Sequence, residues 1–241
     1  EDSFENRDPR MRQTILHPND VAFYKFHLND GRAYPRLNGM AGGRVSNTGY
    51  HVIKNYNADD MIGKAFNTAE SPAITLRFAE ALLIYAEVQA ELSKITQGDL
   101  DLTINKLRDR VKMPHLKLDN VPVDPRYAAD GISPILAEIR RERRIELFNE
   151  GFRYDDLRRW KQGAKLRKKA LGLAMNASQK TRYNGSVVRL FKDPVNGKEY
   201  LEPYAGSDFA DPVFDEAKHY LWPIPLNNLA QNPAIKQNPG W

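Results

Sequence analysis

"ERRIELFNEGFRYDDLRRW", residues 142–160, places five arginines and five carboxylates among isoleucine, leucine, phenylalanine and tryptophan in nineteen positions. Within it, Glu142, Glu146 and Glu150 recur at every fourth residue, so they line one ridge of a helix. Three roles suit such a stretch: a catalytic carboxylate pair, a patch that binds nucleic acid, or a buried set of ion pairs that holds helices together. The choice among them decides which class of protein this is.

A catalytic role fits this stretch least well. Neighbouring carboxylates on one ridge lie about 6 Å apart, but a glycosidase pair flanks the scissile bond from opposite sides of a cleft. Arg143, three residues before Glu146, and the other nearby arginines would keep every carboxylate ionised. A general acid needs a raised pKa instead. We therefore favour ion pairs in which arginines clamp carboxylates of the neighbouring segment 153–160 and fix how consecutive helices cross.

Nucleic-acid binding is the remaining role, and the charge distribution argues against it. The net charge of +5 comes from residues 140–169, which hold twelve Lys or Arg against five Asp or Glu, so the remainder of the chain sums to −2. Glutamates interleaved with Arg140, Arg141, Arg143 and Arg144 would repel a phosphate backbone, and no aromatic stacking platform accompanies them. We expect no nucleic-acid partner.

Composition excludes several further classes of site. The chain has no cysteine, which rules out a disulfide framework, a thiol nucleophile and a cysteine-based zinc site. The five histidines lack metal-ligand spacing, so we expect no metal site and no cofactor. "DPVNGKE" (193–199) falls short of an EF-hand loop, which leaves structural calcium open. No run of eighteen apolar residues exists to span a membrane.

The clearest helix is predicted at residues 71–96, with Ser71 as N-cap and Pro72 at the first helical position. It carries two apolar rows: Phe78, Leu82, Tyr85 and Leu92 form one, and Ala79, Leu83, Ala86 and Ala90 form the other. A second helix follows Gln97-Gly98-Asp99 and ends before Pro114. Such a pair is of tetratricopeptide type, and further helices must stack on it because one pair cannot cover its own apolar faces.

Later segments add helices, a hairpin and an extended end. Ser133 and Pro134 begin a helix expected to run to Gly151, and a further helix is expected to begin near Asp155. The alternating segments on either side of Asn196-Gly197 predict a β-hairpin. The proline-rich residues 219–241 are expected to be mostly extended.

Four stretches, in chain order, resemble the SusD/RagB family of nutrient-binding lipoproteins of Bacteroidetes outer membranes. The first stretch, "FENRDPRMRQTIL" (4–16), is similar to the family's Asp-Pro-Arg segment. "LRFAEALLIYAEVQAEL" (76–92) with "INKLRDRVKMP" (104–114) resembles its central helix pair, and 142–160 resembles its late motif. "YLWPIPLNNLAQNPAIKQNPGW" (220–241) resembles its carboxyl end. The resemblance covers essentially the whole chain.

This resemblance implies a mostly α fold: a right-handed, tetratricopeptide-like helical superhelix with loop-rich insertions and a small β-hairpin. It divides the chain into a loop-rich, aromatic ligand-face segment (1–70) and a helical scaffold with an extended tail (71–241), expected to form one compact domain. Because family members carry a lipid-bearing cysteine and several helices before the Asp-Pro-Arg segment, the sequence looks like a C-terminal half. The missing N-terminal half is then an expected partner.

The resemblance also implies a function without turnover. Family members bind glycans or other nutrients at the cell surface, anchored to the outer membrane by their lipid, and sit as a lid over a TonB-dependent barrel transporter. Two other classes stay open: a peptide-binding or protein–protein scaffold of tetratricopeptide type, and, more weakly, a glycoside hydrolase.

Ligand contacts in this family come from variable loops, whereas the shared motifs are scaffold. Residues 20–60 are aromatic and rich in Gly, Asn and Asp, with turn patterns that leave no room for a long helix. Planar rings stack on pyranose faces while Asn, Asp and Arg bond hydroxyls. Tyr24, Tyr34, Arg36 and Tyr50 are therefore the candidate ligand-binding residues, with loop or core packing as the alternative for each tyrosine.

Overall fold

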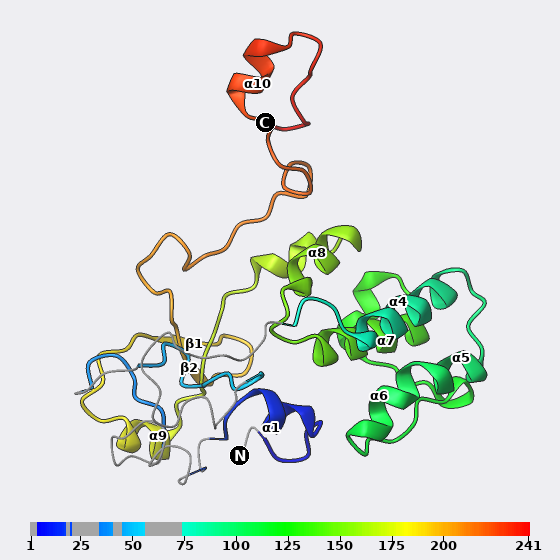
Figure 1. Cartoon of the computed structure of the whole chain (residues 1–241). Coiled ribbons are helices and arrows are strands. Elements are labelled where there is room, and N and C mark those ends of the chain that lie inside the picture. The colour runs from blue at the N-terminus through cyan, green and yellow to red at the C-terminus, as the bar shows by residue number, and fades with distance from the viewer. Residues whose placement is uncertain (1–3, 18–19, 21–33, 41–44, 56–73) are drawn as a thin grey trace. The chain divides into compact units, whose positions relative to one another are not determined.

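The computed structural model describes residues 4–17, 20, 34–40, 45–55 and 74–241 (Figure 1). They belong to two compact units, one comprising Glu1–Pro35 and Tyr50–Phe152, the other Arg36–Gly49 and Arg153–Trp241. The boundary expected at residue 70 lies within 56–73, outside the described residues, so that division of the chain stays a prediction. Each unit is described by itself below.

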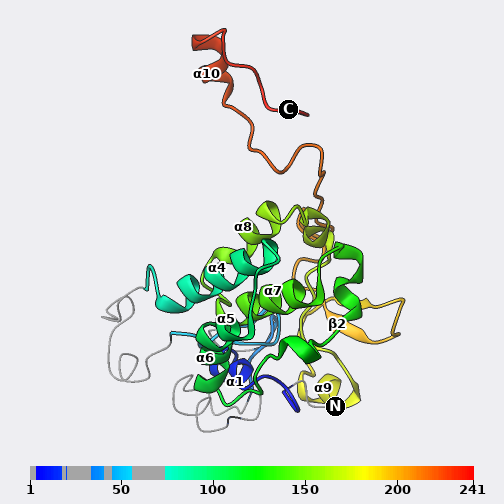
Figure 2. The same ribbon diagram turned by 90° about the vertical axis from the view of Figure 1, so that its right-hand side faces the viewer.

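Helices dominate the described residues, and a two-stranded antiparallel sheet accompanies them, which confirms the predicted fold class. The first unit contains α1 (Arg10–Thr14), α4 (Phe78–Glu91), α5 (Gln97–Leu102), α6 (Ile104–Arg110) and α7 (Pro134–Glu146). Two 3-10 turns, Leu118–Asn120 and Pro125–Asp130, connect α6 to α7. Helix α4 packs along α7 and also contacts α5 and α6 (Figures 1 and 2).

The core of this unit lies on the small-residue row of α4. Ala79, Leu83, Ala86 and Ala90 are all buried, as the sequence predicts, against Leu100, Ile104, Leu107, Leu136 and Ile139 of the neighbouring helices. Alanines at this spacing let a neighbouring helix approach closely. The other row of α4 is less covered: Phe78, Tyr85 and Leu92 keep 73%, 46% and 57% of their surface exposed. Among the described residues, only one of the two apolar rows is therefore enclosed.

Helix α4 begins at Phe78, later than predicted, and Ser71 and Pro72 lie outside the described residues. Its N-cap is Arg77, whose backbone is extended (φ −144°, ψ 153°) and makes no capping hydrogen bond through its side chain. That side chain instead reaches Glu146 and Glu150. The prediction of the helix start was wrong because a tertiary ion pair, rather than a local cap, fixes the conformation of Arg77.

Helix α7 begins as predicted and ends earlier. Ser133 accepts a hydrogen bond from the Leu136 amide, the expected cap. The helix ends at Glu146 rather than continuing to Gly151, because the carbonyl oxygen of Glu146 accepts hydrogen bonds from Lys54 Nζ (2.7 Å) and Arg77 Nη2 (2.6 Å). An additional helical turn would need that oxygen for residue 150.

The second unit holds shorter elements. They are a 3-10 turn at Gly163–Arg167, α9 (Ala177–Arg182), β1 (Leu190–Lys192), β2 (Glu199–Leu201) and α10 (Leu226–Gln231). Helix α8 (Phe152–Arg159) starts before the predicted Asp155, and all of it except Phe152 belongs to this unit. The predicted hairpin is confirmed: β1 pairs antiparallel with β2, Leu190 opposite Leu201, and Gly197 takes a left-handed φ of 68° in the turn. No helix among the described residues has the length and apolar character to cross a bilayer.

Candidate functional site

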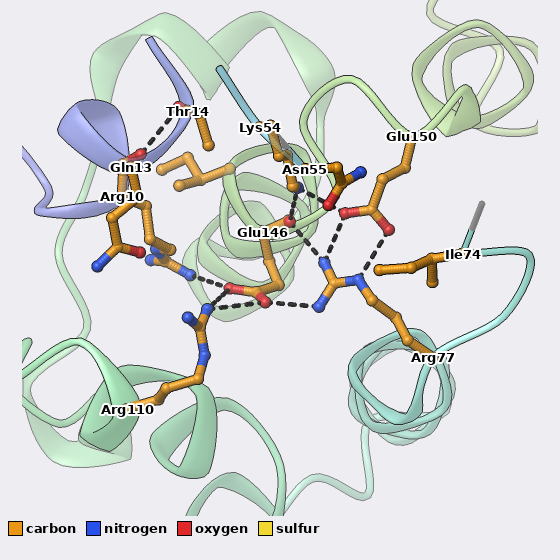
Figure 3. Close-up of a pocket in the computed structure, with 11 residues that line it drawn as sticks. Arg10, Gln13, Thr14, Lys54, Asn55, Ile74, Arg77, Arg110, Glu146 and Glu150 are labelled. Carbon is orange, nitrogen blue, oxygen red and sulfur yellow. Dashed lines mark hydrogen bonds and ion pairs between the residues drawn. The ribbon is translucent and has the colours of Figure 1, made fainter. Parts of the chain in front are cut away.

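A pocket of about 340 Å³ lies in the first unit where five segments meet (Figure 3). Helix α1, residues 54–55, residues 74–77, the end of α6 and the end of α7 all contribute side chains to it. Its lining includes Glu146, the middle member of the carboxylate ridge of residues 142–150. Ile145 and Glu150 also line it, so the charged stretch 142–160 supplies three of its residues.

Glu146 is the most heavily bonded carboxylate of the pocket. Arg10 Nη1 lies 2.9 Å from its Oε2, Arg77 Nη1 lies 2.8 Å from its Oε1, and Arg110 Nη2 lies 2.8 Å from Oε2. Only 2% of the Glu146 side chain is exposed. Three guanidinium groups, from three separate segments, thus surround one buried carboxylate, as Figure 3 shows.

The neighbouring carboxylates extend these contacts in both directions along α7. Glu142 lies 2.5 Å from Arg10 Nη1 and 2.9 Å from Arg108 Nε, and Glu150 lies 2.7 Å from Arg77 Nε and 2.5 Å from Lys54 Nζ. Further pairs join Asp8 to Arg10, and Glu138 to Arg108 and Arg141. We call this set the ion-pair network; its members are Asp8, Arg10, Lys54, Arg77, Arg108, Arg110, Glu138, Arg141, Glu142, Glu146 and Glu150.

Buried ion pairs are what the sequence predicts here. Within the first unit, the carboxylates of α7 pair with cations from α1, α6 and the residues before α4, which the sequence did not single out. Contacts between the arginines of α7 and segment 153–160, which belongs mostly to the second unit, stay a prediction. Within that segment, Arg159 pairs with Asp156 at 3.0 Å on its own helix. The guanidinium of Arg143 lies 5.2 Å from the centroid of the Phe152 ring.

The electrostatics of the pocket keep its carboxylates charged. Burial favours the neutral form of Glu146, but hydrogen bonds from Arg77 and Arg10 outweigh burial and lower the pKa of this carboxyl. Burial is likewise outweighed at Glu150, whose pKa is lowered by Arg77 and Lys54, and at Asp8, whose pKa is lowered by Arg10. A general acid would need the opposite shift. Glu146 and Glu150, which line the pocket, are therefore held in their charged form.

These lowered pKa values predict that the first unit loses stability in acid. A carboxyl whose folded pKa lies below its unfolded pKa stabilises the fold above the unfolded value, and that stabilisation is lost as pH falls through the folded pKa. The ordinary values are 4.5 for Glu146 and Glu150 and 3.8 for Asp8. We expect the free energy of unfolding, measured by urea denaturation and far-UV circular dichroism, to fall steadily below about pH 4.5. A constant value down to pH 3 would contradict the network's role.

Metal ligation finds no support in the part of the chain that the structure describes, where no three His, Asp or Glu side chains gather as a metal site requires. At the segment considered for calcium, the Asp193 carboxylate accepts hydrogen bonds from the Val195 amide and the Asn196 side chain. These bonds form the hairpin turn. Calcium binding there stays untested.

The predicted ligand-binding residues are placed as follows. Tyr24 lies outside the described residues. Tyr34 and Tyr50 are half-buried in the first unit, and the Tyr50 ring centroid lies 6.4 Å from that of Phe4. Arg36 is half-buried in the second unit, where its backbone pairs with Val45. Their role in ligand binding stays a prediction.

Sequence reasoning missed the cations that complete the site. Arg10, Lys54, Arg77 and Arg110 lie between 36 and 136 residues from Glu146. One local feature pointed to Arg10: Asp8, two residues earlier, accepts from both its backbone amide and its side chain. A short Asp-x-Arg spacing of this kind holds a guanidinium in one orientation, ready for a distant carboxylate.

Comparison with known proteins places this chain in a family. The model of the SusD family matches residues 1–241. The chain is 26% identical over 194 residues to the SusD-like protein P2 of Formosa agariphila, covering 79% of this chain and 30% of that protein. It also resembles the crystal structure of a SusD-like protein from Bacteroides fragilis, with 25% identity and a TM-score of 0.61, covering 99% of this chain and 40% of the other.

The structural likeness confirms the predicted tetratricopeptide-like helical fold. The chain spans less than half the length of either relative. Since the family model matches from the first residue to the last, the chain belongs to the SusD family.

Proposed function

We propose that this protein is a cell-surface subunit that captures oligosaccharide and hands it to a TonB-dependent outer-membrane transporter. The observation that carries the proposal is the match of the SusD family model to all 241 residues. The family is generally one of nutrient- and glycan-binding partners of such transporters. In this proposal the protein acts at the outer membrane, held by a lipid on a cysteine outside these residues, together with an N-terminal half of the family fold.

The chemistry of the pocket supports binding without turnover. Its two lining carboxylates, Glu146 and Glu150, are ionised and ion-paired, so neither is prepared to protonate a leaving group. A glycosidase also needs its two carboxyl groups on opposite sides of a substrate, whereas these two lie on one ridge, four residues apart. Product analysis after long incubation with bound glycans tests this directly, and any cleavage would contradict it.

The aromatic residues of segment 20–60 give the proposal its mutational test. Replacing Tyr24, Tyr34 or Tyr50 by alanine should weaken the affinity for a bound glycan by about 1–3 kcal/mol, the magnitude known for stacking on aromatic rings. A glycan array identifies the ligand, and isothermal titration calorimetry then measures each variant. The melting temperature should change little for a tyrosine that contacts ligand, whereas a packing tyrosine lowers it.

Tyr204 provides the matched control. It is an exposed tyrosine of the second unit whose ring packs edge-on against Phe209, and it lies outside segment 20–60. Its replacement by alanine should leave glycan affinity unchanged. If the three segment variants also bind normally, the ligand site lies elsewhere and this assignment of residues is wrong.

A peptide-binding or scaffold function is the alternative, and one observation favours it. The exposed row of Phe78, Tyr85 and Leu92 on α4 resembles a face that receives an amphipathic helix. A glycan array that stays negative, together with binding of helical peptides that is lost when Tyr85 is replaced by glutamate, would support this reading.

A further inference from the structure

Three side chains around the pocket keep hydrogen-bonding capacity that the ion-pair network does not use. Gln13 and Asn55 are exposed, and neither side chain bonds to any described residue. Arg110 donates to Glu146 through Nη2 alone, so within the described residues its Nε and Nη1 remain available. Figure 3 shows Gln13 and Asn55 on either side of Glu146, with Arg110 approaching from a third direction.

The charge of the network is not fully balanced. Among the described residues it contains six cations and five carboxylates, an excess of one positive charge. Arg110 is the most exposed of the six, with 52% of its side chain accessible, whereas Arg10 keeps only 3%. Among these six cations, Arg110 is therefore the one that an anion from solvent reaches most easily.

These features together specify a ligand. A guanidinium with two free donors pairs with a carboxylate, and amide side chains both donate to and accept from hydroxyl groups. Ile74 and Ile145 add apolar surface for the C–H face of a ring, and a volume of about 340 Å³ lies in the usual range for small-ligand sites. We propose that this pocket binds a sugar residue that bears a carboxylate, a uronate, with its carboxylate on Arg110 and its hydroxyls on Gln13 and Asn55.

The inference rests on the proposed glycan binding and adds a substrate class and a second binding position to it. Of the candidate tyrosines that the structure describes, neither Tyr34 nor Tyr50 lines this pocket. A uronate-containing oligosaccharide can therefore use the pocket for its acidic residue, while contacts elsewhere hold the other residues. Affinity for such a ligand should fall as salt is raised, because Arg110 is exposed enough to be screened.

The backbone conformation of Asn55 allows its side chain to be removed without straining the chain. Its φ is +62°, a left-handed conformation that glycine adopts freely, so Asn55→Gly removes the amide while keeping the backbone. Asn6 is the matched control, because it has a φ of +52°, is exposed, and does not line the pocket. Arg110→Gln tests the charge. Because Arg110 also contacts buried Glu146, the folding of this variant must be checked by circular dichroism, whereas the Asn55 side chain forms no hydrogen bond or ion pair with the described residues of the network.

The experiment is calorimetric titration with oligouronates of galacto, gluco and manno configuration, each paired with its methyl ester, which keeps the sugar and removes the charge. At least one acid should bind about tenfold or more tightly than its ester, the ratio expected for one charged hydrogen-bonded pair. Asn55→Gly should lower the affinity for that acid about threefold to tenfold, because one hydrogen bond is lost. Arg110→Gln should abolish the preference for acid over ester, and Asn6→Gly should change nothing.

The outcomes separate this inference from the proposed function. Esters or neutral oligosaccharides that bind as well as every acid overturn the uronate site and leave glycan binding intact. If Asn55→Gly and Arg110→Gln both leave the preference for acid unchanged, the uronate carboxylate binds elsewhere, and the assignment to this pocket is overturned. Failure of all acids, esters and neutral glycans to bind overturns both.

Discussion

Replacing Arg10 by methionine should lower the free energy of unfolding of the first unit by about 3–5 kcal/mol, the cost of breaking a buried ion pair by removing one partner. Arg10 is 3% exposed, and its guanidinium contacts Asp8, Glu142 and Glu146. Without it, two carboxylates that are themselves almost fully buried lose a shared cation. Methionine fills much of the space, so the loss reports charge rather than a cavity.

The two units can be followed separately in one sample. Trp160, Trp222 and Trp241 are the chain's three tryptophans, and all belong to the second unit, whereas the longer helices α4 and α7 belong to the first. Far-UV circular dichroism therefore reports mainly on the first unit, and tryptophan fluorescence reports on the second. The control is Arg7→Met, since Arg7 is exposed. A loss below 1 kcal/mol for Arg10→Met would show that the network contributes little.

The size of this effect has a structural reason. The hydrogen bond from Arg10 to Glu146 joins residues 136 positions apart, so it ties α1 to the end of α7. The Asp-Pro-Arg segment and the charged stretch 142–160 are two separate motifs in the sequence. In the structure the two motifs form one set of ion pairs. The charges of each motif can be buried because the other motif supplies charges of opposite sign.

Local features of the fold were predictable from the sequence, because the residues that determine them lie close together in the sequence. The alanine row of α4 and the Ser133 cap depend on residues within a few positions of one another, and both are confirmed. The hairpin at Gly197 depends on a turn of the same short range. Periodicity and turn chemistry act over one or two helical turns, so they report such features directly.

The partners of the carboxylates were not predictable in the same way. Glu146 offered a choice among 36 lysines and arginines, and charge alone does not distinguish them. In the structure Glu146 pairs with Arg10, Arg77 and Arg110, and their positions depend on how α1, α4 and α6 pack around α7. The start of α4 was misplaced for the same reason, because these contacts hold Arg77 extended.

The candidate ligand residues show a different limit. Tyr24, Tyr34, Arg36 and Tyr50 were chosen because loops rich in aromatic residues and glycine carry binding sites in this family. Loops have no periodicity, so composition indicates which segment binds but not which side chains face the ligand. Gln13 and Asn55 were not considered, since only the fold brings α1 and residue 55 to the same pocket.

Replacing Glu146 by alanine should lower the free energy of unfolding as much as the Arg10 change, by about 3–5 kcal/mol, because buried cations are left without their carboxylate. This variant leaves three guanidinium groups without their shared carboxylate. Arg110 is half-exposed and can be hydrated, but Arg10 is buried and Arg77 is largely so. Glu91→Ala is the control, since Glu91 pairs with Arg140 at 3.0 Å but is half-exposed; it should cost no more than about 1 kcal/mol.

The double variant, Arg10→Met with Glu146→Ala, decides whether the two residues act as one structural unit. Each single change leaves a buried charge uncompensated, whereas the double change removes one charge of each sign. Its cost should therefore be smaller than the sum of the single costs, by about 1–3 kcal/mol in a double-mutant cycle followed by circular dichroism. Additive costs would mean that the pair is not coupled. If Glu146→Ala instead keeps its stability and loses all ligand binding, the carboxylate ridge belongs to the ligand site, because a residue that serves only the ligand costs the free protein nothing when it is removed.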